Sequence, residues 1–313
     1  MKRFYFAPLE GITTYIYRNL HHQWFDGMDK YFTPFVSPTS NRDFKSRAKK
    51  DVIPEHNREI PVVPQILSNR GDEFLYTTDR LAEYGYTEIN LNLGCPSGTV
   101  VAKGRGSGFL SDLDGLDRFL DEIYESCPVP LSVKTRIGRY EPEEFSQILK
   151  IYNKYPIHEL TIHPRVRQDF YKNKPNWDVF ETALENSVNP VCYNGDLCTI
   201  EDYERFCERF PTVERIMIGR GLVGNPGLVR EIQTGQKTKK SEVLDFMKAL
   251  QAAYQQCMAD DPVLFKMKEI WAYRAAFFPE SEKLWKKIKK TKRLSDYERL
   301  LEGEMFFRMG TRV

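Results

Sequence analysis

The sequence predicts a (β/α)8 barrel of the TIM type, followed by a C-terminal domain made only of helices. Three observations support this. Eight short runs of β-branched and aromatic residues recur at a steady interval, amphipathic segments lie between them, and the strand signals stop after Gly235. Eight strand-then-helix units over roughly 230 residues have the length and rhythm of such a barrel.

The eight expected strands occupy Phe4–Ala7, Tyr31–Phe35, Val62–Leu67, Glu88–Leu93, Leu131–Thr135, Glu159–His163, Val191–Asn194 and Arg215–Gly219. Between them, Gly115–Ser126 and Glu143–Tyr155 carry apolar residues at helical spacing. A doubly wound open sheet is the competing architecture. It would need only six strands and a glycine fingerprint after the first one, and the sequence has neither feature.

The segments after Gly235 read as helices. Ser241–Met258 and Pro262–Phe277 have helical periodicity, Glu280–Lys292 is rich in lysine, and Ser295–Arg308 is amphipathic. The polar stretch around 234–240 separates them from the barrel. We therefore expect two domains, 1–234 and 235–313.

Composition narrows the class of protein. The 313 residues are 41% hydrophobic and 29% charged, as in a globular protein, and no apolar stretch approaches the ~20 residues that span a bilayer. Six cysteines without a CxxC pair favour reduced thiols over a disulfide framework or a zinc site. We expect a cytoplasmic protein with no structural metal, no membrane association and no obligate protein partner.

The charge is unevenly distributed. The net charge is only +2, yet the chain from Gly235 onward holds twelve Lys and five Arg against eleven Asp and Glu. Seven basic residues and no acidic one lie between Lys283 and Arg293. A basic C-terminal region suggests a polyanionic partner, provided that the lysines share a face.

Reactive residues accumulate where the expected strands end, which is where a barrel of this kind builds its active site. Seven of the eight strands end in polar or glycine-rich tips: Ala7–Gly11, Gln65, Asn92–Pro96, Lys134–Arg136, His163–Arg165, Asn194–Asp196 and Gly219–Gly221.

The last two tips predict a phosphate site. Loops after strands seven and eight commonly bind phosphate, because glycines let backbone N–H groups approach the anion. Asn194 and Gly195 follow the seventh strand, and Gly219 and Arg220 follow the eighth. Each motif alone is also an ordinary turn, but both in the expected order favour the phosphate site.

Lys134 lies on an interior strand, where an ammonium group needs an anionic partner or a ligand. It could form a Schiff base, as in barrel aldolases, or stabilise negative charge on an electron-accepting cofactor. The alternative is a lysine just beyond the strand end with its head in water.

Cys95 stands between Gly94 and Pro96 at the start of a glycine-rich loop, Ser97–Gly108, that we expect to close over a substrate. A lone cysteine is most often a small buried apolar residue, but this position favours a reactive thiol. His163 is either a site residue or a satisfied core histidine, and alone it is weak evidence.

Together these motifs resemble the tRNA-dihydrouridine synthases. The resemblance rests on seven motifs in the family's order across the whole barrel: Ala7–Gly11, Pro64–Ile66, Asn92–Ser97, Val133–Arg136, Ile162–Arg165, Asn194–Asp196 and Met217–Gly221. The Asn-x-Gly-Cys-Pro element is the most specific of them. The helical tail fits the family's RNA-binding domain in position and charge.

The resemblance implies bound FMN, NADPH as reductant, and a uridine of tRNA as substrate. It implies that Cys95 is the general acid and that Asn92 and Arg165 position the uracil. It places the flavin ring and ribityl chain among Pro8, Leu9, Gln65, Lys134 and His163, and the flavin phosphate at Asn194, Gly195, Gly219 and Arg220.

Reducing the 5,6-double bond of uracil requires a hydride at C6 and a proton at C5. The implied roles meet that need, because a flavin supplies the hydride and Cys95 supplies the proton. The sequence departs slightly from the family at Leu9-Glu10 and at Pro164. Two alternatives are a flavin barrel that reduces a free pyrimidine or enone, and a tRNA-binding protein without catalysis.

Overall fold

The computed structural model describes residues 2–39 and 43–309, with side chains up to Glu304. Its contacts divide the chain into two compact units. One comprises the chain up to Glu10, Met28–Asp196 and Phe206–Ile218, and the other comprises Gly11–Gly27, Leu197–Arg205 and the chain from Gly219 onward. The domain boundary that the sequence predicts between residues 234 and 235 stays a prediction.

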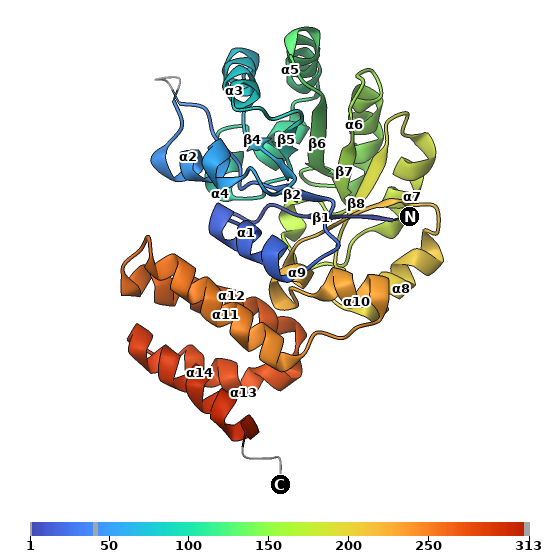
Figure 1. The fold of residues 1–313 in the computed structure, drawn as a ribbon. Helices are drawn as coiled ribbons and strands as arrows, with labels where there is room; N and C mark the ends of the chain where they lie inside the picture. The colour runs from blue at the N-terminus through green and yellow to red at the C-terminus, as the bar shows by residue number, and fades with distance from the viewer. Residues whose placement is uncertain (1, 40–42, 310–313) are drawn as a thin grey trace. The chain divides into compact units, whose positions relative to one another are not determined.

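The first unit is a nearly closed parallel barrel (Figure 1). In the described residues the strands are β1 (Arg3–Phe6), β2 (Lys30–Phe32), β3 (Val62–Val63), β4 (Gln65–Ile66), β5 (Ile89–Leu93), β6 (Leu131–Arg136), β7 (Leu160–His163), β8 (Val191–Asn194) and β9 (Arg215–Ile218). They are hydrogen-bonded in the order β3-β2-β1-β9-β8-β7-β6-β5-β4, and each pair is parallel. Each of the eight expected runs contains strand, so the predicted (β/α)8 fold is confirmed.

The barrel closes at Pro64. Val63 pairs with β2 on one side and Gln65 pairs with β5 on the other, and only Pro64 separates them. Proline has no N–H to donate, so it interrupts the ladder there. The third predicted strand is therefore seen as β3 and β4, and it joins the two ends of the sheet.

Helices and short 3₁₀ turns of this unit connect the strands. The helices are α2 (Ser46–Val52), α3 (Gly71–Glu83), α4 (Gly98–Val101), α5 (Leu113–Ser126), α6 (Phe145–Tyr152) and α7 (Trp177–Asn186), and the 3₁₀ turns are η1 (Pro54–His56), η2 (Gly106–Ser111), η3 (Pro142–Glu144) and η4 (Arg167–Asp169). Figure 1 shows α3, α5, α6 and α7 around the strands. The apolar stripe predicted for α5 is buried at Leu116, Phe119, Leu120 and Ile123.

The barrel interior contains an apolar cluster, and ionic contacts lie at the N-terminal ends of the strands. Tyr5, Ala7, Phe32, Val63, Cys192 and Met217 form a buried cluster. At the N-terminal ends of the strands, Glu159 accepts a hydrogen bond from Tyr5 at 2.8 Å and pairs with Arg215 at 3.2 Å, while Lys30 pairs with Glu88 at 2.6 Å. These contacts fill the closed end of the barrel, which is the end associated with stability.

The second unit is helical. It contains α1 (Tyr15–Trp24), α9 (Arg220–Gly224), α10 (Leu228–Thr234), α11 (Lys240–Gln255), α12 (Asp260–Phe277), η5 (Pro279–Ser281), α13 (Glu282–Ile288) and α14 (Leu294–Met309), while α8 (Ile200–Arg209) has residues in both units. The predicted tail helices are confirmed, although α13 is shorter than the lysine-rich segment. No described helix is long and apolar enough to span a membrane.

An aromatic cluster joins α1 to α11. The Phe246 ring lies 5.7 Å from the Tyr17 ring and 5.3 Å from the Phe25 ring. His21 is buried beside them, and its Nε2 lies 2.9 Å from the Pro226 carbonyl oxygen. Burial lowers the pKa of His21 to about 3, so this histidine stays neutral and belongs to the core.

Candidate functional site

A layer of polar side chains occupies the C-terminal end of the barrel interior. Alternate residues of a strand face the same side, so Asn90 and Asn92 share a face of β5, and Ser132, Lys134 and Arg136 share a face of β6. Gln65 Nε2 donates to Asn90 Oδ1 at 2.7 Å, and Asn90 Nδ2 donates to Ser132 Oγ at 2.9 Å. These side chains hold one another in place, which gives the site a rigid floor.

Asn92 ties this floor to the loop that carries Cys95. Its Nδ2 donates to Gln65 Oε1 at 2.7 Å, and its Oδ1 accepts from the backbone N–H of Gly94 at 3.0 Å and of Cys95 at 2.9 Å. The Asn92 side chain therefore fixes the backbone from which the Cys95 thiol projects. One N–H of its amide is left for a ligand.

Cys95 is held from its other side by the start of η2. Its carbonyl oxygen accepts from Ser107 N at 3.1 Å and from Ser107 Oγ at 2.8 Å. Gly106 has φ +57°, and a Cβ there would lie 2.8 Å from the Cys95 oxygen, so the position requires glycine. The expected loop contains α4 and η2. Gly106, Ser107 and Gly108 are buried, so the end of the loop is packed, whereas Gly98, Thr99, Ala102 and Lys103 are exposed.

The Cys95 thiol is arranged to keep its proton. Burial raises the pKa of this thiol, and the charge of Glu10 adds to the rise, while the hydrogen bond from the Ser97 backbone and the charges of Arg136 and Lys134 oppose it. A thiol with a raised pKa is protonated at neutral pH and can donate a proton. The two cations favour the thiolate that such a donation leaves behind.

Lys134 is a partly exposed cation with no hydrogen-bond or ion-pair partner among residues 2–39 and 43–304. Desolvation lowers its pKa to about 7, and the charge of Arg136 contributes to the shift. An ammonium group that is desolvated and unpaired favours an anionic ligand. The structure thus leaves room for both sequence-based interpretations of Lys134, as a nucleophile and as a partner of a negatively charged cofactor.

Arg136, to which the sequence assigns no role of its own, is the main connector at this end of the barrel. It is 1% exposed, and it donates to the carbonyl oxygens of Gly94 at 3.0 Å, Val166 at 2.9 Å and Phe170 at 2.9 Å. Its guanidinium also lies 5.6 Å from the centre of the half-exposed Tyr171 ring. The alternation of β6 places Arg136 on the face of Lys134, and that is the signal that could have identified it.

His163 and Arg165 form a second group. Arg165 Nη1 donates to His163 Nε2 at 3.0 Å and to Asp196 Oδ1 at 3.0 Å, and its Nη2 donates to Asp196 Oδ2. A guanidinium cannot accept a hydrogen bond, so His163 Nε2 is the acceptor and the ring proton is on Nδ1. Arg165 is buried and largely paired, so it orients His163 and anchors the loop after β7.

The glycine-containing segments that follow β8 and β9 each make local contacts of their own. Asn194 Nδ2 donates to the Met217 carbonyl oxygen at 2.8 Å, which leaves the other amide N–H and Oδ1. At Gly195 a Cβ would lie 2.0 Å from the Tyr193 hydroxyl oxygen, so packing alone demands glycine there. In the second unit, Gly219 and Arg220 begin α9, and the Gly219 oxygen accepts from Leu222 N. Pro8 and Leu9 follow β1 after Ala7.

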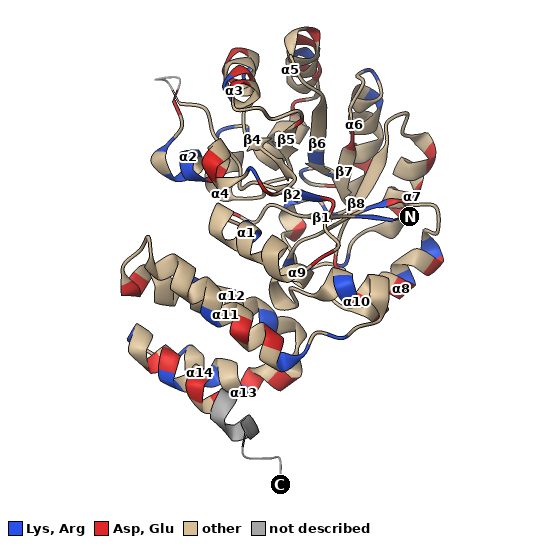
Figure 2. Cartoon of the chain, viewed as in Figure 1, with Lys and Arg blue, Asp and Glu red and all other residues tan. Residues whose placement is uncertain are grey.

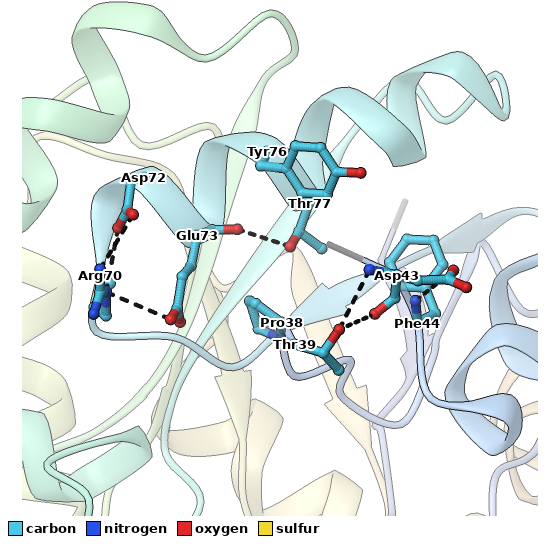
Figure 3. Close-up of a pocket in the computed structure, with 9 residues that line it drawn as sticks. All are labelled: Pro38, Thr39, Asp43, Phe44, Arg70, Asp72, Glu73, Tyr76 and Thr77. Carbon is cyan, nitrogen blue, oxygen red and sulfur yellow. Dashed lines mark hydrogen bonds and ion pairs between the residues drawn. The ribbon is translucent and has the colours of Figure 1, made fainter. Parts of the chain in front are cut away.

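A surface pocket of about 320 Å³ lies elsewhere on the first unit, between the segment after β2 and the start of α3 (Figure 3). Three of its charged groups pair with one another, since Arg70 contacts Asp72 at 3.2 Å and Glu73 at 3.4 Å. None of the sequence-predicted site residues lines it. In the described part of the chain no three His, Cys, Asp or Glu residues are grouped to hold a metal ion.

Comparison with known proteins gives one consistent result. The family model for dihydrouridine synthase matches residues 5–307. The chain is 28% identical over 269 residues to a probable tRNA-dihydrouridine synthase of Staphylococcus aureus, covering 84% of this chain and 80% of the relative. It is 29% identical over 234 residues to tRNA-dihydrouridine synthase B of Pasteurella multocida, covering 74% and 69%.

A solved structure, a complex of 2-naphthoyl-CoA reductase, shares the fold, with a TM-score of 0.56 and 10% identity over 75% of this chain and 50% of that one. The family match spans both the barrel and the tail helices. The chain therefore belongs to the dihydrouridine synthase family, whose members are oxidoreductases that act on tRNA uridine.

Proposed function

We propose that this protein reduces a uridine of tRNA to dihydrouridine, with FMN as the bound cofactor and NADPH as the electron source. The observation that carries the proposal is the family match over residues 5–307, together with a protonated Cys95 thiol and an unpaired, desolvated Lys134 at the same end of the barrel.

The residues present fit a flavin. Lys134 supplies a positive charge without a protein partner, and Gln65, Asn92 and Asn194 retain amide hydrogens that their described contacts do not use. The ring and ribityl chain would be held by Pro8, Leu9, Gln65, Lys134 and His163. The phosphate would be held by Asn194, Gly195, Gly219 and Arg220.

When bound and reduced, the flavin supplies a hydride to C6 of the uracil ring. Cys95 holds the matching proton on Sγ and donates it to C5, which completes the reduction of the double bond. Asn92 and Arg165 are proposed to position the uracil, Asn92 by its free amide hydrogen and Arg165 through the loop that it anchors. Lys134 favours negative charge on the flavin, whereas a Schiff base has no part in this reaction.

The substrate also has to leave its stack to reach the barrel mouth, and binding elsewhere on the RNA has to offset that cost. We propose that residues 1–234 carry the chemistry and that 235–313 bind tRNA. The exposed lysines on and just after α13 support this, because Leu284 and Ile288 are buried while Lys283, Lys287 and Lys290 are exposed. Figure 2 shows both acidic and basic segments along α14.

The absorbance spectrum of the purified protein tests the cofactor. We expect the bands of an oxidised flavin and the release of FMN on denaturation. A colourless protein that takes up no added FMN contradicts the proposal. Comparing turnover with folded tRNA and with free uridine separates it from a flavin barrel that reduces free pyrimidines.

A further inference from the structure

The loop between β7 and α7 carries two consecutive exposed aromatic residues, Phe170, which is 39% exposed, and Tyr171, which is 48% exposed. Phe170 is also the one non-glycine residue with a positive φ among the described residues, with φ 49° and ψ −96°. Bulky side chains rarely adopt that conformation, and residues that do so cluster at functional sites.

Buried groups hold the strained conformation. Arg136 Nη2 donates to the Phe170 carbonyl oxygen at 2.9 Å, and Phe170 N donates to the Arg167 carbonyl oxygen at 3.3 Å. Arg167 N in turn donates to the Gly138 carbonyl oxygen at 2.9 Å. The turn at Phe170 is thus anchored to the barrel through β6 and the segment that follows it.

The strained turn gives the two rings different surroundings. Tyr171 lies 6.0 Å from the His163 ring and over the Arg136 guanidinium, within the site described above. The Phe170 ring lies 5.2 Å from the Arg167 guanidinium, and Phe170 contacts that site through its backbone carbonyl oxygen. Phe170 is therefore an exposed ring, backed by a cation, one residue away from the barrel mouth.

The charges of the loop favour a polyanion. Arg167, Lys172 and Lys174 are basic, and Asp169 is the one acidic residue between Pro164 and Asn176. The Asp169 carboxylate is occupied locally, since it accepts from Val166 N at 3.0 Å and from Asn173 Nδ2. An exposed aromatic ring among cations is the combination that binds unpaired nucleotides, because the ring stacks on a base and the cations contact phosphates.

We propose that Phe170 is a stacking platform for a base of the RNA adjacent to the uridine that enters the site. The inference rests on the proposed function, because it takes the barrel mouth as the place of the target base. Stacking on Phe170 stabilises the opened strand beside the extruded uridine. Removing one such stack lowers RNA affinity about 5-fold to about 150-fold.

The test compares tRNA binding by flavin-loaded variants, measured by fluorescence anisotropy at one salt concentration. Phe170→Ala is expected to bind more weakly by that factor, and Phe170→Trp is expected to bind like the parent, with its indole emission quenched by RNA. Val188→Ala is the matched control, because Val188 is 72% exposed and precedes β8 at the opposite end of the barrel.

Phe170→Gly separates stacking from backbone strain, because glycine accepts the positive φ and also removes the ring. Stacking predicts that Phe170→Gly binds as weakly as Phe170→Ala, whereas a purely structural role predicts binding like the parent. In a second arm, tRNA with an abasic nucleotide on either side of the target uridine is used. The weakening caused by Phe170→Ala should vanish with one of these two RNAs.

Parental affinity of Phe170→Ala, or a weakening that persists with both abasic RNAs, overturns the inference and leaves the proposed function intact. Failure of the parent protein to bind tRNA at all overturns both. Because binding is measured without turnover, the inference is judged separately from uridine reduction.

Discussion

Lys134 should titrate near neutral pH when the flavin site is empty. Desolvation lowers its pKa from the ordinary 10.5 to about 7, and this difference corresponds to about 5 kcal/mol between the charged and neutral forms. The figure is an upper bound, because Lys134 is partly exposed. Competitive labelling with a small amine-directed reagent, read by peptide mass spectrometry, should give Lys134 a reactivity midpoint near pH 7 in the flavin-free protein.

The same shift makes stability depend on pH. Between about pH 7 and 10.5 the folded protein binds fewer protons at Lys134 than the unfolded chain. The free energy of unfolding therefore rises with pH in this window. Lys134→Met removes that contribution. The difference in unfolding free energy between parent and variant should change by at most about 1.4 kcal/mol per pH unit in this window. A Lys134 midpoint near 10, with parallel pH profiles of the two proteins, would show that the pKa of Lys134 is not lowered in the folded protein.

Three further predictions concern the acid, its support and the tail. Cys95→Ala should retain flavin binding and reduction by NADPH but slow uridine reduction by about 10²-fold or more in rapid-mixing kinetics, and an unchanged rate would assign the acid elsewhere. Gly106→Ala should slow the same half-reaction, because its Cβ would press on the Cys95 backbone at 2.8 Å, and parental alkylation kinetics of the thiol would contradict this. Reversing Lys283, Lys287 and Lys290 to Glu should weaken tRNA binding and flatten its salt dependence by about one unit of log–log slope for each phosphate that is no longer bound, with flavin content unchanged; an unaltered slope would mean that the RNA lies elsewhere.

The barrel could be predicted from the sequence because its strands are short apolar runs at regular intervals, and that pattern is local. The split of the third strand at Pro64 follows from the missing N–H, which the sequence also displays. The lysine-rich segment was harder to predict. Helix α13 ends at Ile288, so Lys290 lies beyond the helix although it belongs to the lysine-rich segment that was expected to be helical.

The connections within the site could not be predicted, because they depend on tertiary contacts. The alternation of β6 places Arg136 on the face of Lys134, but nothing local indicates that Arg136 binds three carbonyl oxygens, or that Arg165 directs its guanidinium to His163 and Asp196. Likewise, the glycines after Cys95 predict a loop that closes over a substrate, and this stays a prediction. The close approach of Gly106 to the Cys95 backbone, a tertiary contact, shows that glycine is also needed there for packing.

Nucleoside analysis of tRNA tests the central proposal most directly. Unmodified tRNA is incubated with the protein, FMN and NADPH, then digested and analysed by mass spectrometry. We expect that one uridine gains two hydrogens and appears as dihydrouridine, and that free uridine under the same conditions is left unchanged. Flavin-loaded protein that oxidises NADPH but leaves every uridine of the tRNA unreduced would contradict it.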